Sequence, residues 1–478
     1  MKIRNILYII LFFLSACTQQ ESEFKTLAVG ANTVFEINSA GLVNGACLFD
    51  SGVGSPGTDR SQGTSYHKNN TDLASTNGTT NPCVVSSAGS PFAAADAGNG
   101  IIITAGSNWT VQRALIVSVD GSGNATLDRA CGSAATLSGG TWGLGGACAL
   151  GNSTSGITDD SLFEMAVAGN IFYVKGPGTF TPSAIAISAA GGTQNPIKVI
   201  GYTGTRSTLA TGTNRPVFDL GANNMSIGQN WKISNMAFTS TGGNGVIGSN
   251  NGIIVNSKFT NTSTTANRNA VIPGSDSVFI GNEAISYRGN AINTSTNGSV
   301  IKNNYIHDSN IGITVGTAAV AVVIQGNLII NNVTSAINVT NTVVGGLGIF
   351  ENTLFGTLAQ RGTGLAVATG GRNIRLINNI ITGFTTGVSH ADSQSIGFDD
   401  YNNYYNNGTD VTNWTKGAND RALNPSFGNV GEVTGSGATS ASSTLTDGSK
   451  NFTTAGVVAG RDFLYVSSAT GVTVGIYP

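Results

Sequence analysis

The sequence predicts an all-β fold whose main part is a solenoid of short strands, and three observations lead to this prediction. The chain of 478 residues contains 66 glycines, with charged residues at only 10% and hydrophobic residues at 40%. Globular proteins carry about 25% charged residues and about 7% glycine, so this composition favours short strands joined by turns over helical bundles. Two sequence motifs also recur with nearly the same period between residues 230 and 410. The net charge of -2 disfavours a nucleic-acid-binding protein held by phosphate contacts.

The chain begins with the pattern of an export signal. Two basic residues precede an apolar stretch at residues 6–14, which is too short to span a bilayer as a helix of about 20 residues. The segment from Leu14 to Cys17 resembles the lipobox of bacterial lipoproteins. This resemblance implies a signal peptide at residues 1–16, lipidation of Cys17, a tether at residues 17–30, and a location in the bacterial envelope, at the outer membrane or cell surface. The alternative is ordinary signal-peptide cleavage beside an incidental cysteine.

Four further cysteines lie before residue 150 and mark a separate N-terminal module. In an exported chain, four cysteines predict two disulfides with three possible connectivities. No close spacing of cysteine or histidine indicates a metal site. We therefore expect residues 31–155 to form a small β-rich module that is stapled by disulfides among Cys47, Cys83, Cys131 and Cys148.

The first recurring motif is an asparagine that precedes a large apolar residue by two or three positions. Its copies are 21 to 27 residues apart. The second motif, a small residue followed by a branched apolar one, recurs out of phase with the first, from Gly245-Val246 to Gly387-Val388. Two registers imply at least two strands in each repeat. The asparagines are Asn235, Asn256, Asn282, Asn304, Asn327, Asn352, Asn379 and Asn403.

These registers predict a right-handed parallel β-helix with about 24 residues in each coil. Each coil buries its alternating apolar side chains in a common core, and its strands pair with the coils above and below at about 4.8 Å. Parallel crossovers are overwhelmingly right-handed, which predicts the hand. We expect the asparagines at a corner, where their amides form a ladder; the functional alternative is that this row binds sugar. The ladder is expected at Asn304, Asn327, Asn352, Asn379 and Asn403.

Residues 156–428 resemble the right-handed β-helix proteins of the pectate-lyase-like superfamily. The resemblance is most specific at its ends, in the segment Ser161-Leu162-Phe163-Glu164 and in the closing segment from Leu423 to Phe427. The first segment has the form of a capping box, which predicts a short helix that covers the first coil. Residues 429–478 look like a partial second copy of the N-terminal module. An ending just after a strand predicts a fragment, with a natural terminus as the alternative, and such flanking modules also resemble phage tail fibres and tail spikes.

Candidate catalytic residues are few. Arg375 and Asp399 each stand four residues before a ladder asparagine, Asn379 and Asn403, which predicts that they are neighbours on consecutive coils. Together with Asp400 they are the candidate catalytic residues. One interpretation is a surface ion pair worth about 0 to 1 kcal/mol, and the other is an acidic and basic patch that processes sugar.

The remaining polar positions give weaker signals. His307 is expected in a turn, His390 on an inward-facing row, and His67 in a polar loop; no pair of them has the spacing of metal ligands. The residue that follows the branched apolar residue of each second motif is expected to face outward. None of the residues in this row is charged, so we expect no catalytic groove on that sheet. The row is Ile247, Ile272, Asn293, Thr314, Asn338, Ala366 and Ser389.

The function expected from the sequence is that of a surface-anchored lipoprotein whose β-helix engages polysaccharide or another cell-surface ligand without catalysis. The sequence lacks the Arg-x-Pro-x-x-Arg segment of pectate lyases and the motif set of polygalacturonases, so whether it is an enzyme stays open. One alternative is a polysaccharide lyase or glycoside hydrolase that uses Arg375, Asp399 and Asp400; another is a phage tail fibre or spike component. No cofactor is evident, and Ca²⁺ is expected only for a lyase. The expected partners are a polysaccharide or cell-surface glycan and, through the lipid anchor, a membrane, but no nucleic acid.

Overall fold

The computed structural model describes residues 32–151 and 159–425, except 266, 287, 317–318, 341–345, 357–361 and 393–396, together with the backbone of four short strands between 439 and 477. The chain divides into two compact units, Met1–Asp420 and Arg421–Pro478. The predicted signal peptide, Cys17 and the tether lie outside the described residues. Within the described part, no helix has the length and apolar character that crossing a membrane requires.

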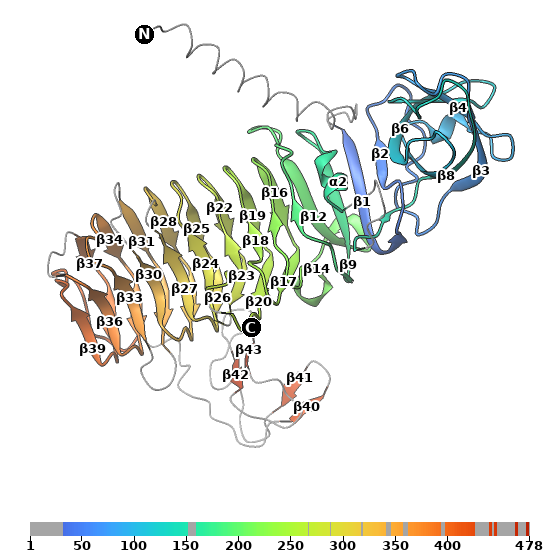
Figure 1. The fold of residues 1–478 in the computed structure, drawn as a ribbon. Coiled ribbons are helices and arrows are strands. Elements are labelled where there is room, and N and C mark those ends of the chain that lie inside the picture. The colour runs from blue at the N-terminus through green and yellow to red at the C-terminus, as the bar shows by residue number, and fades with distance from the viewer. Residues whose placement is uncertain are drawn as a thin grey trace, which may run out of the picture. The chain divides into compact units, whose positions relative to one another are not determined.

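The first unit contains a parallel β-solenoid in which each coil contributes a strand to each of three sheets (Figure 1). Consecutive coils pair in parallel, with the inward residues of one coil lying on those of the next. Sheet 1 contains β9 (Ile171–Gly176), β12 (Ile197–Thr203), β16 (Trp231–Ser234), β19 (Ile253–Val255), β22 (Val278–Ile280), β25 (Val300–Lys302), β28 (Val322–Gln325), β31 (Leu347–Phe350), β34 (Ile374–Ile377) and β37 (Gly397–Asp400).

The other two sheets have ten strands each. Sheet 2 contains β10 (Gly178–Phe180), β14 (Pro216–Asp219), β17 (Ala237–Ser240), β20 (Lys258–Asn261), β23 (Glu283–Ser286), β26 (Tyr305–His307), β29 (Leu328–Ile330), β32 (Thr353–Phe355), β35 (Ile380–Thr382) and β38 (Asn403–Tyr405). Sheet 3 contains β11 (Ile185–Ala186), β15 (Met225–Ser226), β18 (Val246–Ile247), β21 (Val271–Ile272), β24 (Asn290–Thr294), β27 (Ile311–Val315), β30 (Ser335–Val339), β33 (Thr363–Val367), β36 (Thr386–His390) and β39 (Thr409–Thr412).

Sheet 1 begins earlier in the chain than the sequence indicates. Strand β1 (Thr33–Leu42) pairs in parallel with β9, and β2 (Leu48–Asp50) pairs with β1 in antiparallel fashion. Residues 33–42, which the sequence assigns to the N-terminal module, therefore belong to the solenoid sheet. The pairing brings together residues far apart in the chain, such as Ile37 and Val174, and no local pattern signals it.

The N-terminal module contains a closed six-stranded barrel, whereas the sequence predicts only a small β-rich module with disulfides. The two disulfides join Cys47 to Cys148 and Cys83 to Cys131, which selects one of the three connectivities that the sequence left open. The barrel strands, in their order around the barrel, are β3 (Lys68–Ser75), β4 (Val84–Ser86), β7 (Ala125–Leu127), β6 (Gln112–Val119), β5 (Gly100–Ala105) and β8 (Leu137–Leu144). A short 3-10 helix, η1 (Ala94–Asp96), precedes β5.

An ion-pair network joins this module to the solenoid. Strand β13 (Thr205–Leu209), which pairs with the end of β12 and precedes the 3-10 helix η2 (Gly212–Asn214), carries Arg206. The Arg206 guanidinium donates to Glu36 on β1 and to Asp59 of the module, each at 2.8 Å. Glu36 is fully buried and also accepts a hydrogen bond from Tyr202. Burial raises the pKa of Glu36, although Tyr202 and Arg206 oppose the rise.

The predicted helix before the first strand exists, but its start differs from the prediction. Helix α2 (Asp159–Glu164) already contains Ser161, so the proposed capping box is wrong. Asp159 instead accepts hydrogen bonds from the backbone of Gly151 and Ser183, which ties the helix to neighbouring segments. Phe163 is fully buried, and its ring centroid lies 4.9 Å from that of Phe172 on β9.

A ladder of asparagines lines the corner between sheets 1 and 2. In each step the backbone N–H and the side-chain amide of one residue donate to the Oδ1 of its successor, over chain separations of 22 to 27 residues. The residue before each ladder position adopts a left-handed backbone, for example Asn378 with a φ of 60°. The ladder residues are Asn282, Asn304, Asn327, Asn352, Asn379 and Asn402.

The ladder position of the last coil is therefore Asn402, and the prediction of Asn403 is wrong by one residue. Asn403 lies on β38, whereas Asn402 accepts from Asn379 and donates its backbone N–H to Asp420 at 2.7 Å. Asn235 and Asn256 are likewise off the ladder, because both take the left-handed position before it. Asparagine suits both positions, so the sequence pattern alone does not separate them.

The second unit is described only by backbone strands. Strand β40 (Thr439–Ala441) pairs in antiparallel fashion with β41 (Thr444–Thr446), and β42 (Leu464–Val466) pairs with β43 (Gly475–Tyr477). These hairpins lie in the segment for which the sequence predicts a partial second β module.

Candidate functional site

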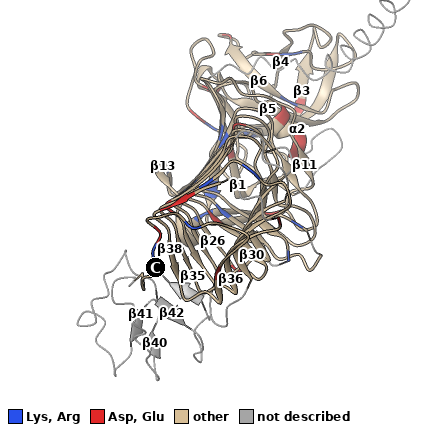
Figure 2. Ribbon diagram, turned by 90° about the vertical axis from the view of Figure 1, so that its left-hand side faces the viewer, with Lys and Arg blue, Asp and Glu red and all other residues tan. Residues whose placement is uncertain are grey.

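Two hollows lie on the outer face of sheet 1. Successive side chains of a strand point to opposite faces of the sheet. Ile301 and Ile324 point inward and are fully buried, whereas Val300 and Val323 beside them point outward and are only partly covered. Figure 2 shows that charged residues occupy only a small part of the coils. The charged residues that face outward near the hollows are therefore few.

Two adjoining hollows lie on this face at the C-terminal coils, and both are lined by Phe350. The larger has a volume of about 710 Å³ and is lined by Val323, Gly348, Arg375 and Phe398, which are direct neighbours on β28, β31, β34 and β37. The smaller has a volume of about 390 Å³. We call the two hollows together the terminal groove.

A glycine opens the floor of the larger hollow. Gly348 stands where the neighbouring strands carry Val323 and Arg375. A Cβ atom at Gly348 would lie 2.3 Å from the ring of Phe350, so the aromatic ring occupies the space that a side chain needs. The missing side chain therefore makes room for the ring of Phe350, which lines the hollow beside Gly348.

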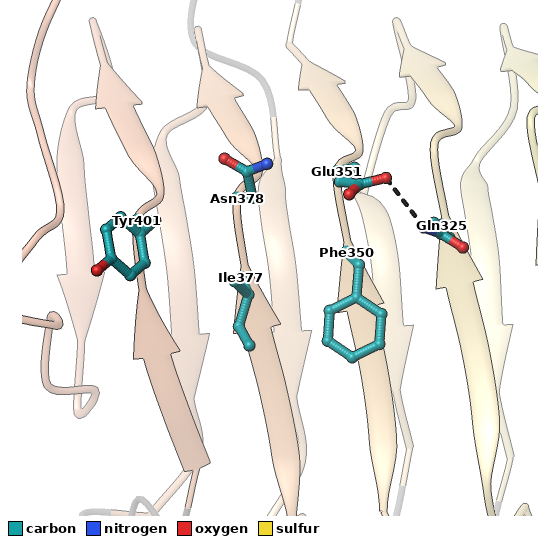
Figure 3. A pocket seen from close by; sticks show the side chains of 6 residues that line it. All are labelled: Gln325, Phe350, Glu351, Ile377, Asn378 and Tyr401. Atoms are coloured by element: carbon teal, nitrogen blue, oxygen red, sulfur yellow. Dashed lines mark hydrogen bonds between the residues drawn. The ribbon is translucent and has the colours of Figure 1, made fainter.

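The smaller hollow lies where sheet 1 turns into the ladder corner (Figure 3). Gln325 donates from its side-chain amide to the carboxylate of Glu351 at 2.9 Å. Glu351 and Tyr401 both adopt the left-handed backbone of the corner, with φ values of 57° and 60°. Tyr401 is 60% exposed and Phe398 is 55% exposed, so two aromatic rings face solvent around this groove.

Arg375 is the cationic group of the terminal groove. Its side chain is exposed on β34 and, among the described residues, forms no ion pair. It lies between Gly348, which has no side chain, and Phe398. An accessible guanidinium beside an aromatic ring can bind a carboxylate or a hydroxyl group of a ligand.

The structure separates the three predicted catalytic residues. Arg375 is aligned with Phe398, and Asp399 is aligned with Leu376, so the predicted pairing of Arg375 with Asp399 is wrong. The reason is the one-residue slip at the last ladder position, because adjacent residues of a strand face opposite sides. Arg375 points outward into the terminal groove, whereas Asp399 points into the solenoid interior.

Asp399 is held in a buried polar cluster at the end of the solenoid. Its carboxylate accepts hydrogen bonds from the hydroxyl of Tyr404 at 2.7 Å, from the indole of Trp414 and from the amide of Asn402. Burial raises the pKa of Asp399 to about 7; Asp420 adds to the rise, and the hydrogen bonds of Tyr404 and Trp414 oppose it. A carboxyl group enclosed in this way does not contact a ligand on the outer face.

Asp400 faces outward at the rim of the groove. Its carboxylate accepts from the side-chain amide of Asn419 at 3.0 Å and from backbone N–H groups of Asn419 and Tyr401. These hydrogen bonds, led by the one from the Asn419 side chain, lower the pKa of Asp400. Asp400 is therefore an ionised, fixed carboxylate.

A second polar cluster lies on the outer face of sheet 2. Glu283 on β23 accepts from Lys258 on β20 at 2.8 Å and lies 3.2 Å from the Nε2 atom of His307 on β26. The Nδ1 atom of His307 lies 2.7 Å from Asp308, and its ring stacks on Tyr305 with centroids 4.1 Å apart. The sequence predicted a turn residue at His307; the structure places it on a strand, because Tyr305 and His307 alternate outward.

The charges in this second cluster compensate each other. Burial opposes protonation of His307, but its hydrogen bonds to Asp308 and Glu283 outweigh burial and raise its pKa. Burial likewise opposes ionisation of Glu283, yet His307 and Lys258 lower its pKa to about 2. Both ring nitrogens of His307 are thus engaged by carboxylates.

The other predicted positions carry no chemistry of this kind. His390 is buried, as expected, and its ring nitrogens lie 2.7 and 2.8 Å from the carbonyl oxygens of Asp392 and Gly371. His67 lies 3.7 Å from Asp96. The outward row of sheet 3 includes Asn293 and Thr314, which are aligned as predicted. In the described ranges, no group of three or more His, Cys, Asp or Glu side chains could hold a metal ion.

The aromatic residues of the groove were missed by reasoning from the sequence. Phe398 and Tyr401 carried a signal, since both are large aromatic residues that flank the polar pair Asp399-Asp400. Their outward direction depends on the ladder register at Asn402. Without that register, Phe398 reads as an ordinary core residue.

Comparisons with known proteins give similarity to solved structures alone. No family model and no curated protein matches the chain. The periplasmic alginate epimerase AlgG is 16% identical over 54% of this chain and 74% of its own, with a TM-score of 0.32. An alginate lyase from Paenibacillus sp. str. FPU-7 is 12% identical over 55% and 94%, with a TM-score of 0.36. The catalytic unit of a GH87 alpha-1,3-glucanase from Streptomyces thermodiastaticus strain HF3-3 is 11% identical over 76% and 87%, with a TM-score of 0.32.

Proposed function

We propose that this protein binds polysaccharide on the outer face of its solenoid, with the terminal groove as the main contact. The observation that carries the proposal is the combination of two exposed aromatic rings, Phe398 and Tyr401, with the guanidinium of Arg375 around the two adjoining hollows of the terminal groove. A sugar ring has apolar C–H faces and polar edges. Aromatic rings cover such faces, while the guanidinium of Arg375 and the amide of Gln325 reach the edges.

The groove is a binding site rather than a hydrolytic one. Glycoside hydrolysis needs a carboxylic acid with a raised pKa and a second carboxylate, both beside the scissile bond. The pKa of Asp400 at the rim is lowered, and the carboxyl group whose pKa is raised, Asp399, points into the interior. This arrangement supports a non-catalytic role for the groove.

The cluster on sheet 2 supports a second candidate function, cleavage of a bound polysaccharide. Glu283, Tyr305, His307 and Asp308, whose pKa values are shifted, lie together on one outer surface, and Lys258 pairs with Glu283 there. Shifted pKa values are enriched at catalytic sites, although ion-pair networks also produce them. Incubation with a panel of polysaccharides, followed by absorbance of unsaturated products and by reducing ends, tests this function. Products whose rate is unchanged in a His307→Gln variant would exclude the cluster.

Export and lipid anchoring through Cys17 stay part of the proposal, supported by the lipobox-like segment. Labelling of cells with radioactive palmitate tests the anchor. We expect incorporation into the protein and its loss in a Cys17→Ala variant. Absence of label in the unaltered chain would favour ordinary cleavage or a phage-derived component.

A binding assay with matched variants tests the groove. Affinity of the full chain for immobilised polysaccharides is measured before and after Phe398→Ala, with Phe355→Ala as control because Phe355 is an exposed phenylalanine at the end of β32 on sheet 2. Loss of an aromatic contact worth about 1 kcal/mol lowers affinity about fivefold. We expect this loss for Phe398→Ala and unchanged affinity for the control. Equal losses, or no binding to any polysaccharide, would contradict the proposal.

A further inference from the structure

The outer face of sheet 1 continues the chemistry of the terminal groove over the whole solenoid. Two columns of outward residues run along the stack, each defined by the pairing of consecutive strands from β12 to β37. The first column is Lys198, Lys232, Ile253, Val278, Val300, Val323, Gly348, Arg375 and Phe398. The second is Ile200, Ser234, Val255, Ile280, Lys302, Gln325, Phe350, Ile377 and Asp400.

These columns are apolar and cationic. They contain four cations, Lys198, Lys232, Lys302 and Arg375, and one carboxylate, Asp400, at the last strand. A second carboxylate, Glu351, borders them at the ladder corner, where it accepts from Gln325. None of the four cations forms an ion pair with another residue in the described part of the chain. The remaining positions are mostly Ile, Val and Phe, although the chain as a whole has a net charge of -2. The positive charge of this face is therefore local.

The cations are spaced along the solenoid axis. Lys232, Lys302 and Arg375 lie three strands apart from one another, which corresponds to about 14 Å per step at the strand spacing of about 4.8 Å. At physiological salt the screening length is about 8 Å, so each cation acts on its own nearby anion. Apolar side chains fill the intervals between them.

We infer that the outer face of sheet 1 is a track for an acidic polysaccharide that lies parallel to the solenoid axis. The inference rests on the proposed function and adds the charge of the ligand, its direction and its length. From β12 to β37 the track is about 38 Å long. Carboxylate or sulfate groups of the polymer meet Lys232, Lys302 and Arg375, and its ring faces lie on the apolar side chains between them.

Other occupants fit this face less well. Two copies that paired through it would bring like charges together, which opposes self-association. Double-stranded nucleic acid carries a charge every 1.7 Å, roughly, whereas this face offers a cation about every 14 Å with apolar residues between. A sparsely charged polymer with apolar ring faces matches both features.

The test compares ligand length and ligand charge. Affinity of the full chain is measured for alginate fragments that reach only the terminal groove, for alginate long enough to span about 38 Å, and for dextran of the same length. The variants are Lys232→Gln with Lys302→Gln, Phe398→Ala, and Lys416→Gln as control, since Lys416 lies off this face and pairs with Asp410. Circular dichroism checks that each variant is folded.

We expect the double lysine variant to lose affinity for long alginate at least about fivefold, with short fragments and dextran unaffected. Phe398→Ala should weaken all three ligands, because it removes a contact of the groove. If Phe398→Ala lowers the affinity for long alginate and the double lysine variant does not, the inference of a track is wrong, while the proposed binding at the terminal groove still holds. Equal binding of double-stranded DNA or of phosphatidylglycerol vesicles would show a general polyanion surface and also overturn the inference.

Discussion

Removal of one ladder side chain, in the variant Asn352→Ala, should destabilise the solenoid strongly. Asn352 is 1% exposed, and its Oδ1 atom accepts from both the backbone and the side-chain amide of Asn327 at 2.9 Å. Its own amide donates to the carbonyl of Ile324 at 2.9 Å. Alanine leaves these three groups buried without partners. Each such group costs about 1 to 3 kcal/mol, so the expected loss of unfolding free energy is about 3 to 9 kcal/mol.

The magnitude is measured by urea denaturation, with hydrogen exchange to locate the loss in the central coils. Asn293→Ala is the matched control, because Asn293 lies on β24, faces outward and is only partly buried. It should change stability by no more than about 0.5 kcal/mol. If Asn352→Ala costs no more than this control, water or rearranged partners satisfy the ladder, and the reasoning fails.

Three further predictions concern titration and cross-links. The pKa of Asp399 is raised to about 7 in the folded protein, so its protonated form stabilises the fold. This contribution to the unfolding free energy is full below the ordinary pKa of aspartate and is lost as the pH rises through 7. Urea denaturation from pH 4 to pH 8 should show this fall in stability, and the variant Asp399→Asn should flatten it. The pKa of His307 is also raised, so His307→Gln should cost more stability at pH 5.5 than at pH 9, and an equal cost would contradict the role of its carboxylate partners. The disulfide between Cys47 and Cys148 joins residues 101 positions apart, so its reduction should lower the unfolding free energy of the N-terminal module by about 4 to 5 kcal/mol. Unchanged urea midpoints after reduction would show that the barrel is stable without this disulfide.

The solenoid could be predicted from the sequence because its coils repeat local chemistry. The small residue before a branched apolar one marks the inward turn into sheet 3, as at Gly364 and Leu365 on β33. Strand β1 could not be predicted in the same way. It has no copy of the motifs, and only its pairing with β9 assigns it to sheet 1.

The sequence located the part of the solenoid that contains the candidate site, but it did not predict correctly which residues share its surface. Arg375 lines the larger hollow of the terminal groove, and Glu351 lines the smaller, adjoining one. Asp399 was misassigned because the doublet Asn402-Asn403 offers two equivalent registers, and a slip of one residue exchanges the inner and outer faces. The partners of His307 on three consecutive coils lie up to 49 residues apart in the chain, from Lys258 to His307, so spacing alone did not bring them together.

The asparagine ladder has a direction, and Asp420 gives it an end. Each asparagine rung accepts from the coil before it through its Oδ1 atom, and its own N–H groups donate to the coil after it. Asp420 takes the donor of Asn402 but, as a carboxylate, has no proton to hand on. The column of hydrogen bonds that starts in the middle coils therefore ends on a carboxylate that closes the last coil, and the backbone N–H of Asn402 is satisfied there without a further coil.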